Sequence, residues 1–264
     1  MEVSKLINIP YFKKLVKSNL PLLLIFTIIL FLFIVAMYYV FTPQTLEAMG
    51  NVSSEQMQNM AKQGTLIGFM GNSFYAMMAI IFPMVYSIVM GNSLVAKKVD
   101  DGSMAGFLST PVSRGKIIRS TELYIILSLD IMWGIVSIFG IAVANRFQPD
   151  NLDIDKFLLL NLGAYLYHLS ISAICFCSSC IFNTSKNSLT IGAGLPLIFF
   201  VINLLVKMSE DLSFMKYFTL NTLFDTSAIL MEETFIPQFF TMGIIAVVLY
   251  FIGIKVFKKK DLPL

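Results

Sequence analysis

Several unbroken apolar runs of about twenty residues constrain this chain more than any other feature. A helix rises about 1.5 Å per residue, so about twenty residues cross the roughly 30 Å hydrocarbon core of a bilayer. The runs do not alternate at period two, as the strands of a membrane barrel do. Because only helices and closed barrels satisfy their backbone groups in lipid, the runs predict membrane-spanning helices.

The composition agrees with this prediction. Of the 264 residues, 57% are hydrophobic and only 13% are charged, with a mean hydropathy of +0.79. Soluble domains carry roughly 25% charged residues, so a chain this apolar could not cover a surface that faces water. We therefore expect an all-α integral membrane protein with one domain over residues 1–264.

Six spans are predicted, and the fifth is expected to be kinked by Gly192, Gly194 and Pro196. Their approximate limits are 20–41, 73–94, 122–144, 157–182, 189–206 and 237–257. Residues 1–19 mix lysines with apolar side chains, which predicts an amphipathic helix in the inner membrane interface. The alternative is that this segment is only a basic flank that sets the topology.

Two of the loops have a pattern of their own. Residues 207–236 alternate apolar clusters with acidic residues, so we expect short helices at the outer surface that shape the exit. Ser53 followed three residues later by Gln56 matches a capping box and predicts a short external helix through about Gln63.

Lysine and arginine are distributed unequally between the two sides of these spans. Fourteen lie in the two end segments and in the loops of one side, and five lie in the loops of the other side. The positive-inside rule then places both ends of the chain in the cytoplasm. The frequent Lys, Asn and Phe are typical of an AT-rich bacterial genome, so we expect a bacterial plasma membrane.

Signatures of an enzyme are mostly absent. With the single histidine His168, no HExxH zinc site can form, and neither a GxSxG elbow nor a phosphate-binding GxxxxGK[ST] loop occurs. If the protein uses ATP, another chain must bind it. Cys175, Cys177 and Cys180 lie in one apolar run and are interpreted as small residues packed between helices, not as metal ligands. We expect no catalytic residue, metal or cofactor in this chain, and no nucleic-acid partner.

Two ionisable residues lie inside predicted spans. Asp130 is about a third of the way into the third span, where burying a charge costs about 2.5–3.5 kcal/mol. It must pair, become protonated or face water. His168 lies in the middle of the fourth span. Both are candidates for a translocation path, and for each the alternative is a structural hydrogen bond.

The strongest local pattern is in residues 97–114, between the second and third spans. Asp100 or Asp101 can cap the start of a helix, and Pro111 forces it to stop near Thr110. The apolar residues that fall near one face of this helix are Val95, Val99, Met104, Phe107, Leu108 and Val112. We predict a short amphipathic helix parallel to the membrane, suited to receive force from a soluble partner. The alternative is an interfacial helix with no partner.

This segment resembles the permease subunits of ABC-2-type transporters. They commonly carry an acidic residue, then Gly-Thr, then Leu-Leu-Ser-x-Pro-Val/Ile-Ser-Arg in this loop. The matching residues are Asp100 or Asp101, Gly102, Ser103, Phe107, Leu108, Ser109, Pro111, Val112, Ser113 and Arg114. The ending from Gly253 to Leu264 is also similar. The departures are Asp for the usual Glu, Ser103 for Thr, and Thr121 where Lys is common.

The resemblance implies an ABC-2, type V exporter-like fold and a role as a permease subunit. Such a subunit pairs with a second permease, as a homodimer or a heterodimer, and docks two separate ATPase subunits that hold ATP and Mg. ATP-driven closure of the ATPases would push on residues 97–114 and change which side opens. The residues expected to couple are Lys97, Lys98, Asp100, Asp101, Gly102, Phe107, Leu108, Pro111 and Arg114.

The cargo is suggested only by composition. With 24 Phe, 16 Met and 10 Tyr, the spans suit an amphipathic peptide or a lipid-like or drug-like molecule. Two other classes of function are open at this point. One is a membrane immunity or sensor protein without transport, and the other is an ion-coupled secondary transporter that uses Asp130.

Overall fold

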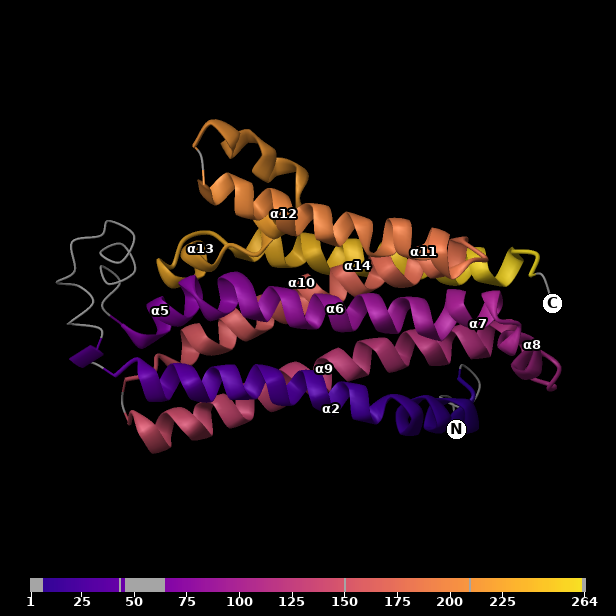
Figure 1. Cartoon of the computed structure of the whole chain (residues 1–264), viewed down its shortest axis with the longest axis horizontal. Helices are drawn as coiled ribbons and strands as arrows, with labels where there is room; N and C mark the ends of the chain where they lie inside the picture. Colours follow the sequence, from indigo (N-terminus) through magenta and orange to yellow (C-terminus); the bar gives the residue numbers. More distant parts are fainter. Residues whose placement is uncertain (1–6, 43, 46–64, 150, 209, 263–264) are drawn as a thin grey trace.

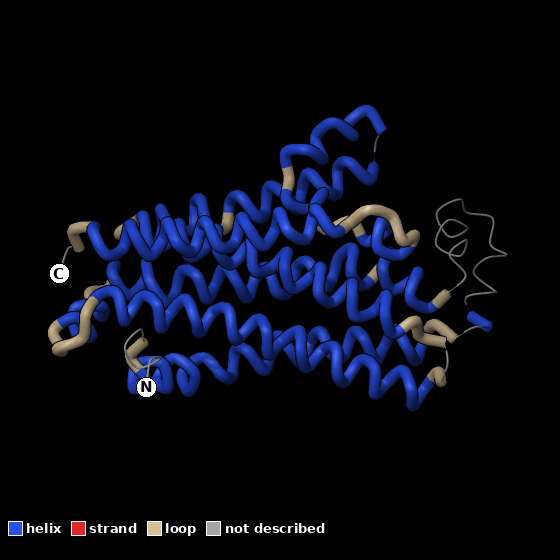
Figure 2. The backbone as a smooth tube through the Cα atoms, turned by 180° about the vertical axis from the view of Figure 1, so that it is seen from behind, coloured by secondary structure: helices blue, strands red, loops and turns tan. Residues whose placement is uncertain are grey.

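The computed structural model describes residues 7–42, 44–45, 65–149, 151–208 and 210–262. Every regular element within these residues is a helix (Figure 2). The external helix predicted from Ser53 to Gln63 lies outside the described residues, as do residues 1–6 of the predicted interfacial helix.

Six helical segments are long and apolar enough to cross a membrane, judged by length and composition. They are Ile9–Val40, Leu66–Asp100, Arg114–Phe147, Ile154–Ile181, Ser185–Val206 and Ile236–Lys259. The predicted all-α fold with six spans is confirmed, although most of the helices extend beyond the predicted limits. The predicted limits followed the apolar runs, whereas the helices continue for some turns into the polar residues that flank these runs.

The first span is α2 (Ile9–Val40), and it corrects the predicted division at residue 19. Ile9 to Val40 is one helix, because a single buried stripe runs along it and packs on α9 (Arg114–Phe147). The stripe consists of Tyr11, Leu15, Leu23, Thr27, Leu30, Ile34 and Tyr38. Pro21 lies on the exposed side, where it removes a single backbone donor without ending the helix.

The second span is built from five consecutive helical pieces. They are α5 (Leu66–Asn72), η1 (Phe74–Met78), α6 (Ala79–Gly91), η2 (Asn92–Ala96) and α7 (Lys97–Asp100). The elements η1 and η2 are π-helical turns, which in other proteins often occur at functional sites. Because α7 belongs to this span, the helix predicted to run through residues 97–110 is not one helix. Only α8 (Ser103–Leu108) is separate, and Gly102, with a φ of 73°, makes the break.

The fourth span, α10 (Ile154–Ile181), lies at the centre of the bundle. It packs against α6, α9, α11 (Ser185–Gly192) and α14 (Ile236–Lys259). The close approach to α14 depends on Gly253, where a Cβ atom would lie 3.0 Å from the Phe176 ring.

The fifth span is interrupted at Ala193, between α11 and α12 (Gly194–Met208), next to the glycines that were expected to kink it. After α12, residues up to the sixth span form η3 (Glu210–Phe218), η4 (Leu220–Leu223) and α13 (Thr226–Leu230). The short helices predicted for this loop are therefore present. Figure 1 shows α12 leaning away from the rest of the bundle.

The start of α2 and the end of α14 lie at one end of the bundle, together with α8 and the start of α11 (Figure 1). We call this the inner end. The opposite end, which holds α5, α13 and the far part of α12, is called the outer end. An even number of spans requires both chain ends to be on one side.

Candidate functional site

The turn between α7 and α8 orients the short helix at the inner end. Asp101 Oδ1 accepts a hydrogen bond from the backbone N–H of Ser103 at 2.9 Å, so Asp101 caps α8. The hydrogen bonds from Ser103 are the main reason why the pKa of the exposed Asp101 carboxyl lies below its usual value. Gly102 adopts the left-handed conformation that other residues adopt only at a cost of roughly 1–2 kcal/mol.

The apolar side of α8 faces the bundle. Met104 is only 1% exposed, and the Phe107 ring meets the Tyr11 ring edge-on with 5.0 Å between centroids. Leu108 is also half-buried against the core. The other side of α8, with Ser103 and Gly106, is exposed. Phe107 and Leu108 therefore attach the helix to the bundle, and the surface left for a partner is the opposite one.

The second and fifth spans are joined at the inner end. Asp100 Oδ2 accepts a hydrogen bond from the backbone N–H of Ser185 at 3.0 Å. Asn92 Nδ2 donates to Ser185 Oγ at 2.8 Å. Of the two candidate caps, Asp101 therefore serves α8, whereas Asp100 caps the first turn of α11. The start of the fifth span is attached to the residues directly before α8.

Beyond α8, the chain returns to the bundle through Pro111. The helix ends at Leu108, in agreement with the stop that Pro111 was predicted to impose. Arg114 Nη1 then donates to the backbone carbonyl of Lys260 at 3.0 Å. Arg114 thus ties the start of α9 to the residue that follows α14.

Lys260 extends this connection to the central helix. Its Nζ donates to the carbonyls of Cys180 at 3.1 Å and Phe182 at 2.8 Å, at the end of α10. Partial burial lowers the pKa of Lys260, and the nearby Cys180 opposes that effect. The inner ends of α9, α10 and α14 are therefore held together by two basic side chains.

The two ionisable residues inside the spans have different surroundings. Asp130 is exposed on the outward side of α9, close to Tyr165 of α10. His168 is fully buried, with Nδ1 2.6 Å from the Ala164 carbonyl and Nε2 3.1 Å from the Ile80 carbonyl. No interaction between Asp130 and His168 is found in the described part of the chain. His168 connects α10 to α6, and a role for either residue in translocation stays a prediction.

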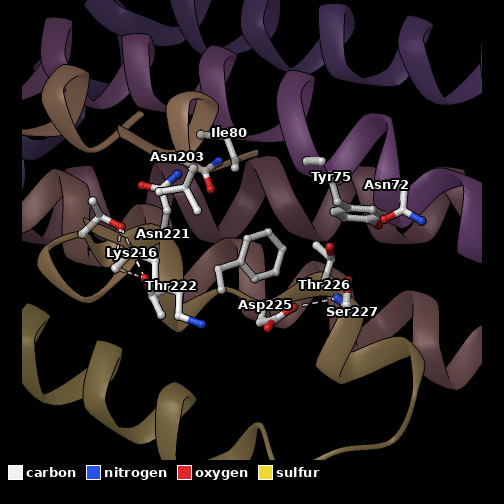
Figure 3. A pocket seen from close by; sticks show the side chains of 14 residues that line it. Asn72, Tyr75, Ile80, Asn203, Lys216, Asn221, Thr222, Asp225, Thr226 and Ser227 are labelled. Atoms are coloured by element: carbon white, nitrogen blue, oxygen red, sulfur yellow. Dashed lines mark hydrogen bonds between the residues drawn. The ribbon is translucent and has the colours of Figure 1, made fainter. Parts of the chain in front are cut away.

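A cavity of about 270 Å³ opens at the outer end between the second span, α12 and the loop before α14 (Figure 3). It combines polar and apolar side chains. The polar residues in its wall include Asn72, Tyr75, Asn203, Lys216, Asn221, Thr222, Asp225, Thr226 and Ser227. The apolar ones are Ala76, Ile80, Val206 and Phe224.

Asn221 is the best-defined polar group of this outer cavity. It is 6% exposed, and its Oδ1 accepts a hydrogen bond from the Tyr167 hydroxyl at 3.1 Å. Its Nδ2 has no hydrogen-bond partner among the described residues. A buried donor without a partner costs about 1–3 kcal/mol, so Nδ2 is suited to bind a ligand group or water.

The sequence did not single out Asn221. It lies in a loop already expected to shape the exit, but nothing in the local pattern separates it from other loop polar residues. Asn203, by contrast, sits within an otherwise apolar span, and a polar residue in a span is a signal of function.

The cysteines pack between helices, as interpreted. All three are buried, and Cys175 lies where α6, α10 and α11 meet. A Cβ atom at Gly91 would lie 2.5 Å from the Cys175 Cβ, so only glycine allows this approach. Cys175 Sγ donates to the Gly192 carbonyl at 2.9 Å.

Six helices that are each long and apolar enough to cross a membrane define the architecture of a multi-pass membrane protein. The chain belongs to the family described as ABC-2 family transporter protein, whose model matches residues 12–262. It is a permease component of an ABC transporter, a class of membrane protein that normally works with ATP-binding subunits. No curated protein and no solved structure matches the chain.

Proposed function

We propose that this chain is the permease subunit of an ATP-binding cassette exporter in a bacterial plasma membrane. It pairs with a second permease subunit, equal or different, and two separate ATPase subunits supply ATP and Mg. The inner end faces the cytoplasm, because the basic residues are concentrated in its loops and chain ends. The transported molecule is an amphipathic peptide or a lipid-like or drug-like compound.

One observation carries the proposal: α8 follows the end of the second span, that end is bonded to the start of the fifth span, and both spans border the outer cavity. Asp101 and Gly102 join it to the end of the second span, and Asp100 joins that same end to the start of the fifth. Both spans contribute residues to the outer cavity, Tyr75 from the second and Asn203 from the fifth. A push on α8 can therefore act on both walls of the cavity.

The exposed side of α8 is the proposed docking surface for an ATPase. Gly106 lies on this side, and a Cβ atom added there would meet nothing within 4 Å. The permease itself consequently tolerates a side chain at this position, whereas a docked partner would not tolerate a large one. ATP binding drives the change to the extent that the ATPases bind ATP differently in the two states.

The mixed wall of the outer cavity supports an amphipathic cargo. Asn203, Asn221 and Thr226 present polar groups, and Ile80 and Phe224 present apolar surface. A ligand with only polar groups would leave the apolar wall without a partner. A ligand with only apolar groups would leave buried polar atoms such as Asn221 Nδ2 unsatisfied.

The decisive experiment uses the whole permease reconstituted in vesicles with the ATPase encoded beside it. Gly106→Trp is expected to abolish stimulation of ATP hydrolysis and binding of the ATPase, while Gly106→Ala retains both. Gly134→Trp on α9, also with open space around its Cβ, is the matched control for a large side chain. Normal coupling in Gly106→Trp, or no complex with any such ATPase, would refute the proposal.

The cargo is tested separately in the same vesicles. ATP-dependent accumulation of an amphipathic helical peptide is expected, and a polar peptide of equal length should not accumulate. Transport of the polar peptide alone would refute the assignment of the cargo without affecting the assignment of the coupling surface.

A further inference from the structure

A second cavity, of about 340 Å³, lies at the inner end and is lined by three lysines. Lys14 comes from α2, and Lys97 and Lys98 come from α7. We call it the lysine cavity. It lies between the first span, the end of the second span and α8, which also contributes Phe107.

The positive charges of the lysine cavity are not neutralised by the described residues. The two ion pairs among the described residues both involve Lys156, which is at the outer end. None of the three cavity lysines is therefore in an ion pair with a described residue. Lys14 Nζ lies 4.9 Å and Lys98 Nζ 5.2 Å from the centroid of the Phe107 ring. Two ammonium groups thus share one ring although they repel each other, which favours an anion between or beside them.

Asp101 is the one acidic residue among the described wall residues of this cavity. Its carboxylate is exposed, and it already accepts a hydrogen bond from the Ser103 backbone. A single carboxylate faces three ammonium groups, so the cavity keeps an excess of positive charge. Its ligand should therefore be an anion.

A polar atom without a partner supports the same conclusion. Ser93 lines the cavity, and its Oγ is buried without a hydrogen-bond partner in the described part of the chain. Ser93 belongs to the π-helical turn η2, one turn before Lys97. A hydroxyl beside ammonium groups is a common donor set for a phosphate oxygen.

The location of the cavity distinguishes between kinds of anion. Its wall includes Asp101 and Ser103, which are exposed, and also Lys14 and Ser18, which are exposed on the first span. Two turns beyond Ser18 on the same side of that helix, Ile25 is 53% exposed, so a ligand whose anionic group lies at the lysines can continue along an exposed apolar face of the span. Basic pockets between spans commonly hold the headgroups of anionic lipids.

We propose that the lysine cavity binds the phosphate of an anionic phospholipid, with the acyl chains directed into the bilayer along the exposed face of the first span that carries Ile25. Lys14, Lys97 and Lys98 contact the phosphate, and Ser93 donates a hydrogen bond to it. The lipid thereby bridges the first span, through Lys14, and α7, through Lys97 and Lys98. This inference does not depend on the proposed cargo or on an ATPase partner.

The test is native mass spectrometry of the full chain in detergent, titrated with phosphatidylglycerol or phosphatidylcholine. The cavity variant is Lys14→Gln, Lys97→Gln and Lys98→Gln. The control, of equal net charge, is Lys13→Gln, Lys17→Gln and Lys186→Gln, all exposed and outside the cavity wall. A lysine that contacts the bound phosphate is expected to strengthen binding by about fivefold. We expect the cavity variant to lose tightly bound phosphatidylglycerol by at least about tenfold, and the control to retain it.

Lys97→Gln alone is the variant that is safe for folding, because Lys97 is exposed. It should bind phosphatidylglycerol about fivefold more weakly than the wild type. Three results would overturn the proposal. One is equal retention of phosphatidylglycerol by the cavity variant and the control, and another is equal binding of phosphatidylcholine. The third is displacement of the bound lipid by millimolar inorganic phosphate or by an added ATPase subunit, which would assign the cavity to a soluble anion or to a protein partner.

Discussion

The carboxylate of Asp100 accepts a hydrogen bond from the backbone N–H of Ser185 at 3.0 Å, across 85 positions of sequence. The end of the second span thereby caps the start of the fifth. Helix caps of this kind stabilise by about 0.5–2 kcal/mol. The bond lies next to α8, so whatever moves α8 also moves the start of the fifth span.

Removal of this bond should uncouple the transporter. Asp100→Ala is expected to keep ATPase binding and ATP hydrolysis but to lower transport per ATP severalfold, because α11 no longer follows α7. Asp100→Asn retains an acceptor oxygen and should be close to wild type. Coupling is measured as the ratio of cargo moved to ATP hydrolysed in vesicles. An unchanged ratio in Asp100→Ala would show that the link carries no force.

Position 91 should not tolerate a residue larger than glycine, because Cys175 packs directly against it. A Cβ at Gly91 would lie 2.5 Å from the Cys175 Cβ and 3.0 Å from its carbonyl carbon, so the spans must separate. Gly91→Ala should destabilise by about 1–3 kcal/mol, measured as a lower midpoint of thermal unfolding in detergent. Gly134→Ala has open space and should be neutral or stabilising by up to about 1 kcal/mol. Equal midpoints for the two variants would contradict the packing.

The free amide of Asn221 offers a direct test of the outer cavity. Asn221→Asp keeps the oxygen that accepts from Tyr167 and removes the Nδ2 donor, so transport should fall; the carboxylate at this buried position should also lower stability by about 1–3 kcal/mol. Asn221→Leu also leaves the Tyr167 hydroxyl without its partner and should cost about 1–3 kcal/mol of stability. Transport assays and thermal unfolding separate the two effects. If Asn221→Asp transports normally, Nδ2 does not contact the cargo.

Asp130 separates ATP-driven export from ion-coupled transport. Its side chain is exposed on α9 and is not part of the described wall of the outer cavity. The proposed function therefore expects Asp130→Asn to transport within about twofold of wild type and to remain dependent on ATP. An ion-coupled mechanism predicts loss of transport in this variant and activity in wild type without ATP. Vesicles with and without ATP, and with a protonophore, provide the measurement.

Much of the fold was predictable because the membrane imposes it. A run of about twenty apolar residues can satisfy its backbone in lipid only as a helix, so six spans follow from the sequence without tertiary information. The interruption at Ala193 was also predictable, from Gly192, Gly194 and Pro196. The continuity of α2 through residue 19 was not, because it depends on Tyr11 and Leu15 being buried by another helix.

The candidate site was also only partly predictable from the sequence. Residues 97–114 were recognisable from the acidic residues, Gly102 and Pro111, which act locally. The orientation of α8 was not, since Phe107 faces inward only because Tyr11 receives it there.

By itself, the sequence determined the all-helical class, the number of spans, the turn at Gly102 and the family resemblance. These depend on backbone chemistry and on residues close together in the chain. Only the tertiary structure decided which groups meet across the bundle: Asp100 with Ser185, Asn221 with Tyr167, and Lys14 with Lys98 around Phe107. The physical reason is that such contacts join residues dozens of positions apart, and helix packing, not local propensity, brings them together.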